Sequence, residues 1–237
     1  MKGVFDIAGV IIEISYNYRY TQKLFEGYEY KGENTPSATI VVSDEELEKE
    51  CKLHPEEPVF YLENLAILRK VMRLLVTKHQ AILFHGSSIK YKDKAYVFTA
   101  VSGTGKSTHT RLLKEYLGDS VEFINDDKPI LKLVDGTVYC YGSPWNGKHH
   151  VGNNVSAPLK AVCIVNRAKD NSITKIPPEI AMKTLFEQSM EFSDEDTAIN
   201  VLNVISKIMA QASFYNLNCN MDLSAAECSY RGMIYED

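Results

Sequence analysis

The stretch 95–108, AYVFTAVSGTGKST, constrains the fold of this 237-residue chain more than any other. An apolar run is followed by a glycine-bearing turn, then by Lys-Ser-Thr, and then by a helical pattern. A loop that wraps a polyphosphate requires this order of strand, loop and helix. Gly103 and Gly105 leave room for phosphates to approach the backbone and for unusual backbone angles. The stretch therefore predicts a site for nucleotide phosphates.

The residues of the segment 102–108 have expected roles. Backbone N–H groups would bind phosphate oxygens, Lys106 would bring positive charge to the terminal phosphates, and the Ser107 hydroxyl would ligate Mg²⁺. The helix that begins near Lys106 adds the positive end of its dipole. The full pattern has glycine where Ala100 stands, and the alternative interpretation is a solvated Gly/Ser loop with an incidental lysine. The expected cofactor-binding residues are Ser102, Gly103, Thr104, Gly105, Lys106, Ser107 and Thr108.

Composition excludes several functional classes. A formal net charge of -5, without a basic tract, argues against nucleic acid as the main partner. The five cysteines are scattered and show no C-x-x-C, which is typical of reduced thiols in a cytoplasmic protein. The N-terminus has no signal-peptide layout and no apolar run reaches membrane-spanning length, so we expect no membrane partner.

The order of expected elements predicts the fold class. Strands are expected at 4–14, 37–42, 81–84, 88–91, 95–100, 121–124, 129–133, 137–141, 159–165 and 214–218, and helices at 44–52, 58–79, 106–117 and 180–188. Ser193 and Ser224 are expected to cap two further helices. Three strands precede the loop closely and a hairpin follows the acidic pair described next. This order favours an α/β fold with a mixed, strongly bent sheet over a doubly wound one. We expect residues 1–57 to form an N-terminal α+β lobe and residues 58–237 a nucleotide-binding domain.

An acidic pair follows the strand expected at 121–124, in the sequence Asn125-Asp126-Asp127. Carboxylates at a strand end, one helical crossover from a phosphate-binding loop, are where Mg²⁺ is held in such proteins. One aspartate can hold metal-bound water while the other accepts a proton from an attacking hydroxyl. The alternative interpretation is an ordinary acidic turn.

Two further segments carry candidate residues. His85 follows the strand expected at 81–84 and could reach the phosphates, although a turn histidine with a satisfied hydrogen bond is the alternative. Trp145 and Lys148 lie in the segment 141–150, whose composition suits a lid or a substrate loop. A packed aromatic beside a solvated lysine is the alternative for this pair.

The runs 83–88, 102–108 and 125–127, in this order and spacing, resemble the HPr kinase/phosphorylase family, which shares its nucleotide fold with phosphoenolpyruvate carboxykinases. The segment 142–148 is similar to the short HPr-kinase-like proteins rather than to true HPr kinases. The likeness covers residues 80–165. It implies a bent-sheet P-loop core of the HPr kinase/PEP carboxykinase type, with a helical C-terminal region.

The resemblance also implies residue roles. Lys106 and the backbone of 102–107 would bind the β- and γ-phosphates of ATP, and Ser107 would ligate Mg²⁺. His85 would lie by the transferring phosphoryl group, Asp126 would be the base, and Asp127 a metal-side carboxylate, or the two aspartates would exchange roles. The signature of true HPr kinases, an acidic residue followed by Arg-Gly-Leu-Gly, is missing, so the acceptor does not carry over.

We therefore expect an ATP- and Mg²⁺-dependent kinase that acts on a hydroxyl of a peptide, a protein serine or a small metabolite. A module that binds ATP without transferring phosphate is the alternative. The aromatic-rich segments 16–20 and 28–30 fit a surface that recruits the substrate, and they fit a β-rich core equally well. The resemblance leaves a homo-oligomer open.

Overall fold

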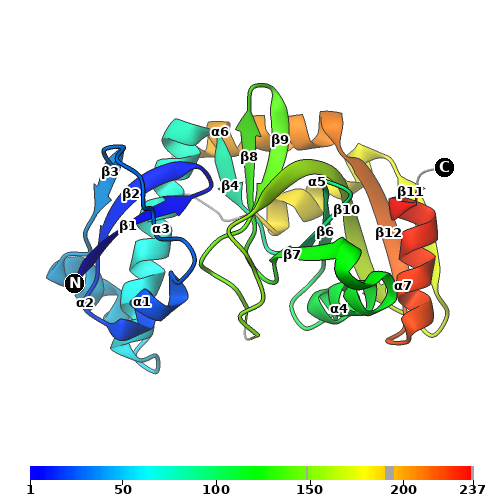
Figure 1. The fold of residues 1–237 in the computed structure, drawn as a ribbon, viewed down its shortest axis with the longest axis horizontal. Helices are drawn as coiled ribbons and strands as arrows, with labels where there is room; N and C mark the ends of the chain where they lie inside the picture. Colours follow the sequence, from blue (N-terminus) through cyan, green and yellow to red (C-terminus); the bar gives the residue numbers. More distant parts are fainter. Residues whose placement is uncertain (148, 190–194, 236–237) are drawn as a thin grey trace.

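A bent sheet with helices on both faces, joined to a smaller three-stranded sheet, makes up the fold (Figure 1). The computed structural model describes residues 1–147, 149–189 and 195–235. In the smaller sheet, β1 (Lys2–Ile7) pairs antiparallel with β2 (Val10–Ser15), and β2 pairs parallel with β3 (Ala38–Ile40). The helices α1 (Arg19–Leu24) and α2 (Asp44–Leu53) belong to the same part of the chain.

The larger sheet has nine strands. Its main path runs β4 (Ala81–Leu83), β8 (Ile130–Val134), β9 (Thr137–Tyr141), β10 (Ser156–Arg167), β6 (Lys94–Thr99), β5 (Ser87–Tyr91) and β7 (Val121–Asn125). Strand β12 (Ser213–Cys219) pairs with β10 on the side opposite β6, and β11 (Ser172–Ile176) pairs with β12.

The long strand β10 bends this sheet. Its first residues, 156–158, pair antiparallel with β9. Residues 159–164 pair parallel with β6, and residues 161–167 pair parallel with β12. Its register against β6 shifts between Leu159 and Ala161, and such a bulge bends a strand and increases its twist. The expectation of a mixed, strongly bent sheet in an α/β fold is confirmed.

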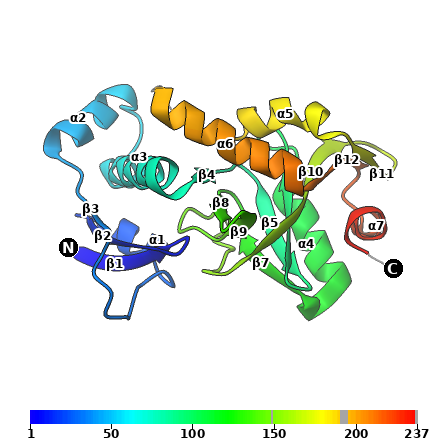
Figure 2. The same cartoon turned by 90° about the horizontal axis from the view of Figure 1, so that it is seen from above.

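Alternating side chains along the central strands reach two separate cores. Val97 and Val162 pack with α3 (Val59–His79), α5 (Pro178–Glu187) and α6 (Glu195–Gln211). Their neighbours Phe98 and Cys163 point to the opposite face, where α4 (Lys106–Leu117) and α7 (Leu223–Ser229) cover the sheet. Figure 2 shows these two helix layers on opposite sides of the strands. Period-two alternation of this kind is what a sheet buried on both faces requires.

A third core joins the smaller sheet to α3. Phe5 and Ile12 of this sheet pack with Met72 and Leu75 of α3, and Trp145 of the later chain closes the same cluster. Since this core takes residues from both sides of position 57, the division into 1–57 and 58–237 stays a prediction. Within the described residues no helix is long and apolar enough to cross a membrane.

Four of the described elements were not expected from the sequence: α1, β11, the 3-10 turn Gly118–Ser120 and the π-helical turn Tyr230–Ile234. Of these, α1 spans only 6 residues and β11 is a largely exposed edge strand, so neither shows a strong apolar period. The expectation that Ser224 caps the last helix is wrong, because α7 starts at Leu223 with Asp222 at the N-cap position. Ser193 lies outside the described residues.

Candidate functional site

The candidate residues meet at one edge of the larger sheet because of the strand order. Strand β5 lies between β6 and β7 and is antiparallel to both. The start of β5 therefore lies beside the ends of β6 and β7: Ser87 is opposite Phe98, and Ser88 is opposite Asn125. The segment before β5 carries His85, and the segments after β6 and β7 carry the glycine-bearing loop and the acidic pair. All three predicted motifs are thus brought together.

The glycine-bearing loop, residues 100–105, is open on its outer side. Gly103 and Gly105 have φ angles of 79° and 122°, which side chains other than glycine rarely adopt. A Cβ atom placed on either glycine meets no atom within 4 Å. Arg167, at the end of β10, donates hydrogen bonds to the carbonyl oxygens of Gly103 and Thr104, the latter at 3.0 Å. Arg167 therefore holds the loop, while the space beside both glycines stays open.

Lys106 is buried at the base of this loop, with only 7% of its surface exposed. Its ammonium donates to the carbonyl oxygen of Ala100 at 3.0 Å. Burial lowers the pKa of Lys106, and the carboxylates of Asp127 and Asp126 oppose that shift. A desolvated cation with carboxylates nearby is typical of a functional site, because it interacts strongly with any anion that enters.

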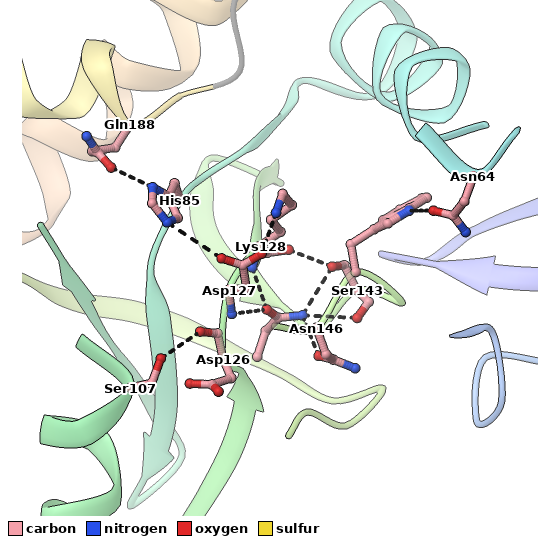
Figure 3. A network of polar contacts seen from close by, with 11 residues as sticks. Asn64, His85, Ser107, Asp126, Asp127, Lys128, Ser143, Asn146 and Gln188 are labelled. Carbon is pink, nitrogen blue, oxygen red and sulfur yellow. Dashed lines mark hydrogen bonds and ion pairs between the residues drawn. The ribbon is translucent and has the colours of Figure 1, made fainter. Parts of the chain in front are cut away.

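Asp126 is the buried member of the acidic pair. Its side chain is 2% exposed, and its Oδ1 accepts a hydrogen bond from Ser87 at 3.2 Å. Ser107 donates to its backbone carbonyl at 3.3 Å (Figure 3). Arg111 lies 3.7 Å from its Oδ2. Among the described residues, Oδ2 has no hydrogen-bond partner. Beside the ion pair with Arg111, this buried oxygen can therefore accept a further ligand, and a metal cation suits it.

Asp127 is more accessible, at 26% exposure, and faces His85. The Nε2 atom of His85 lies 3.5 Å from Oδ1 of Asp127, while Nδ1 lies 2.9 Å from Oε1 of Gln188 (Figure 3). Lys128 forms an ion pair with the other carboxylate oxygen of Asp127. Burial, followed by the charge of Lys106, lowers the pKa of His85 from its ordinary 6.5, so the ring is mainly neutral at pH 7.

Asn125 fixes the turn that carries both aspartates. Its Oδ1 accepts the backbone N–H groups of Asp127 and Lys128 at 2.8 and 2.6 Å. Its Nδ2 donates to the backbone and hydroxyl oxygens of Ser143, and at 2.9 Å to Oδ1 of Asn146. The acidic turn is therefore hydrogen-bonded to Ser143 and Asn146 of the segment that follows β9.

Trp145 anchors that segment to the N-terminal part of the chain. Its indole N–H donates to Asn64 of α3 at 2.8 Å, and its ring meets Phe25 edge-on at 5.5 Å. The side chain is buried, so the geometry favours the packed-aromatic alternative for Trp145. Lys148, the other residue proposed for a substrate loop, lies outside the described residues.

Four residues of the site were not predicted individually: Arg111, Arg167, Gln188 and Ser143, the last within the segment 141–150 that the sequence had singled out. Gln188 reaches His85 across 103 positions, and Arg167 reaches Thr104 across 63. Arg111 alone had a usable position, because it lies one turn after Ser107 on a predicted helix.

The donor set suits Mg²⁺ bound together with phosphates. In the part of the chain that the structure describes, no three His, Cys, Asp or Glu side chains gather to hold a metal by themselves. Mg²⁺ is usually bound through one or two carboxylates, with waters and substrate phosphates completing its shell. The orphaned Oδ2 of Asp126 and the nearby Ser107 hydroxyl fit that arrangement.

Comparisons with known proteins give little independent support for the family resemblance seen in the motifs. No protein-family profile and no curated protein sequence matches the chain. Among solved structures, the chain has a weak neighbour in the Hpr(Ser) kinase/phosphatase from Coxiella burnetii. The TM-score is 0.29 at 11% identity, over 40% of this chain and 71% of that one. A likeness of this size transfers no residue role, so the family inferred from the motifs stays a prediction.

Proposed function

We propose that the chain is an ATP- and Mg²⁺-dependent phosphotransferase that moves the γ-phosphoryl group to a hydroxyl acceptor. One observation carries the proposal. An open glycine-bearing loop, the buried cation of Lys106 and two carboxylates converge where β6 and β7 end. Phosphoryl transfer is catalysed by positioning and by charge neutralisation, and these groups supply both.

A cavity beside the loop suits the nucleoside end of ATP. Its volume is about 390 Å³, and its lining includes Thr108, Leu112, Arg167 and Met221. It adjoins Gly103 and Gly105, so a nucleotide with its phosphates in the loop can place its base and sugar there. Aliphatic side chains cover a base face, while polar groups of the same wall bind the sugar.

The different burial of the two aspartates suggests different roles for them. Asp126 is enclosed, and the Ser107 hydroxyl lies at its backbone carbonyl, so in this proposal Asp126 and Ser107 hold the metal. Asp127 is the exposed carboxylate, and it takes the proton of the acceptor hydroxyl. This exchanges the roles that the family resemblance suggested first, an exchange which the sequence had left open. Bound Mg²⁺ would offset negative charge on the phosphate oxygens.

The proposed reaction is a direct transfer of the γ-phosphoryl group from ATP to the acceptor hydroxyl. The acceptor oxygen forms a bond to the γ-phosphorus, the bond from that phosphorus to the β–γ bridging oxygen breaks, and ADP leaves with the electron pair. The hydroxyl proton passes to Asp127. Lys106 stabilises charge on the transferring group, and His85, held by Gln188, keeps Asp127 in position.

The test is ADP release by the purified protein with Mg·ATP and a panel of acceptors. Serine peptides, free serine, sugars and nucleosides make up the panel, with Lys106→Ala as the inactive control. We expect acceptor-stimulated ADP release that Lys106→Ala abolishes. Mg·ATP binding without turnover on any acceptor would instead support a module that senses ATP.

A further inference from the structure

The carboxylate of Asp126 is held at one oxygen and exchangeable at the other. Its Oδ1 accepts a hydrogen bond from Ser87 at 3.2 Å, and the Ser87 hydroxyl lies 2.7 Å from that of Thr110. Ser87 and Thr110 are completely buried, so they hold the carboxylate in one orientation. A change of partner at the Asp126 carboxylate therefore takes place at Oδ2.

Arg111 is a charged partner that the structure places at this oxygen. Its Nη2 atom lies 3.7 Å from Oδ2, which is an ion-pair distance but too long for a hydrogen bond. The side chain of Arg111 is 43% exposed, whereas that of Asp126 is 2% exposed. The arginine thus neutralises a buried carboxylate, which would be costly to leave without a counter-charge. Because water already reaches the guanidinium, Arg111 can leave this contact when another cation takes its place at Asp126.

The position of Arg111 on α4 gives its guanidinium a second kind of anion to bind. Residue 111 lies one turn after Ser107 on the same helix face, and helical side chains lean toward the N-terminus of their helix. That N-terminus, at Gly105 and Lys106, is where the proposed function places the phosphates. A guanidinium binds phosphate through two parallel hydrogen bonds, which is stronger than a charge contact without a hydrogen bond.

We propose that Arg111 couples metal binding to nucleotide binding, because it competes with the metal ion for Oδ2 of Asp126. This rests on the function proposed above. In the free protein Arg111 pairs with the carboxylate, and together with Lys106 it repels a free divalent cation. When a nucleotide enters with its metal, Arg111 moves to the phosphates and releases Oδ2 for coordination. Arg111 is thus a positioning residue that makes the site select a metal–nucleotide complex over the metal alone.

The test compares two affinities of the full-length protein. The first is for Mn²⁺ alone, measured by the loss of the paramagnetic resonance signal of the free ion, since Mn²⁺ prefers the same oxygen ligands as Mg²⁺. The second is for the Mn²⁺ complex of an ATP analogue whose γ-phosphoryl group cannot be transferred, measured by calorimetry.

Four variants separate charge from structure. Arg111→Gln and Arg111→Met remove the charge with different side chains, so that a folding defect in one leaves the other to be measured. Arg111→Lys keeps the charge. Arg231→Gln is the matched control, because it makes the same substitution in an exposed ion pair with Glu227.

We expect the wild type, Arg111→Lys and Arg231→Gln to bind Mn²⁺ alone with the same weak affinity. Arg111→Gln and Arg111→Met should bind Mn²⁺ alone about fivefold or more tightly than the wild type, since a competitor and a repelling charge are both removed. The same two variants should bind the Mn²⁺–analogue complex more weakly than the wild type, since a charged contact with phosphate is lost.

Two results would overturn the proposal while leaving the proposed function in place. One is that Mn²⁺ alone binds the two neutral variants no more tightly than the wild type, although all of them bind the Mn²⁺–analogue complex. The other is that Arg111→Lys behaves as the neutral variants do with Mn²⁺ alone. If the wild type bound neither the analogue nor its Mn²⁺ complex, the proposed function itself would be refuted.

Discussion

The stability of the protein should depend on the protonation of His109, a residue of α4 that does not take part in the proposed chemistry. This ring is 2% exposed, packs 5.0 Å from the ring of Phe98, and has Nε2 2.9 Å from the hydroxyl of Ser229. Its Nδ1 has no hydrogen-bond partner among the described residues. Burial lowers the pKa of His109 from 6.5 to about 4.

The direction and the size of the effect follow from these two pKa values. A folded pKa below the unfolded one means that the unfolded chain binds the proton first, so stability is complete above pH 6.5 and is lost as the pH falls toward 4. The gap between about 4 and 6.5, at about 1.36 kcal/mol per pH unit, limits the loss to about 3.4 kcal/mol. At about pH 5.5 the same linkage gives a loss of about 1.4 kcal/mol.

Urea unfolding followed by circular dichroism measures this loss. The free energy of unfolding would be compared at about pH 7.5 and 5.5 for the wild type and His109→Gln, which cannot titrate. The wild type should lose about 1.4 kcal/mol more than the variant. Other histidines with lowered pKa values, His79 and His85, contribute equally to both proteins and cancel. Equal losses in the two proteins would refute the reasoning.

Two further predictions concern the site. Asp126→Asn should mainly weaken Mg·ATP binding and Asp127→Asn should mainly lower turnover, as measured by titration and by kcat; the opposite split would make Asp126 the base. The pKa of His85, followed by NMR in the free protein, should lie below 6.5, should fall further in Asp127→Asn and should rise in Lys106→Met. These directions follow because the carboxylate of Asp127 raises the pKa of His85 and the ammonium of Lys106 lowers it. A pKa above 6.5 in the wild type would show that the His85 ring is not desolvated as described.

The parts of the fold with a strong local signal could be predicted from the sequence. Val59–His79 and Lys106–Leu117 form the expected helices because each carries a clear apolar face and a recognisable end. The bent sheet followed from the order of strands around the loop, which leaves no helix between β5 and β6 or between β8 and β9. The sequence predicted that His85 could reach the phosphates, whereas its approach to Asp127 came from the structure.

Contacts between distant parts of the chain could not be predicted. Nothing near Gln188 marks it as the partner of His85, since the contact depends on where α5 ends over the sheet. For Trp145 the sequence left a substrate residue and a packed aromatic open, and its burial and its contacts with Asn64 and Phe25 depend on distant parts of the chain. The cleft that residues 20–28 form with residues 146 and 150–154 likewise depends on two segments far apart in the sequence.

The most direct test of a phosphoryl-transfer site is a calorimetric titration of the protein with ATP, with and without Mg²⁺. The wild type should bind with an affinity that depends on Mg²⁺, and Lys106→Ala should weaken binding about tenfold or more, as expected when a buried charge-assisted contact is removed. Lys114→Ala, at the other end of the same helix, is the matched control and should bind as the wild type does. If ATP bound without regard to Mg²⁺ and equally to all three proteins, the loop and its acidic pair would not be a nucleotide site.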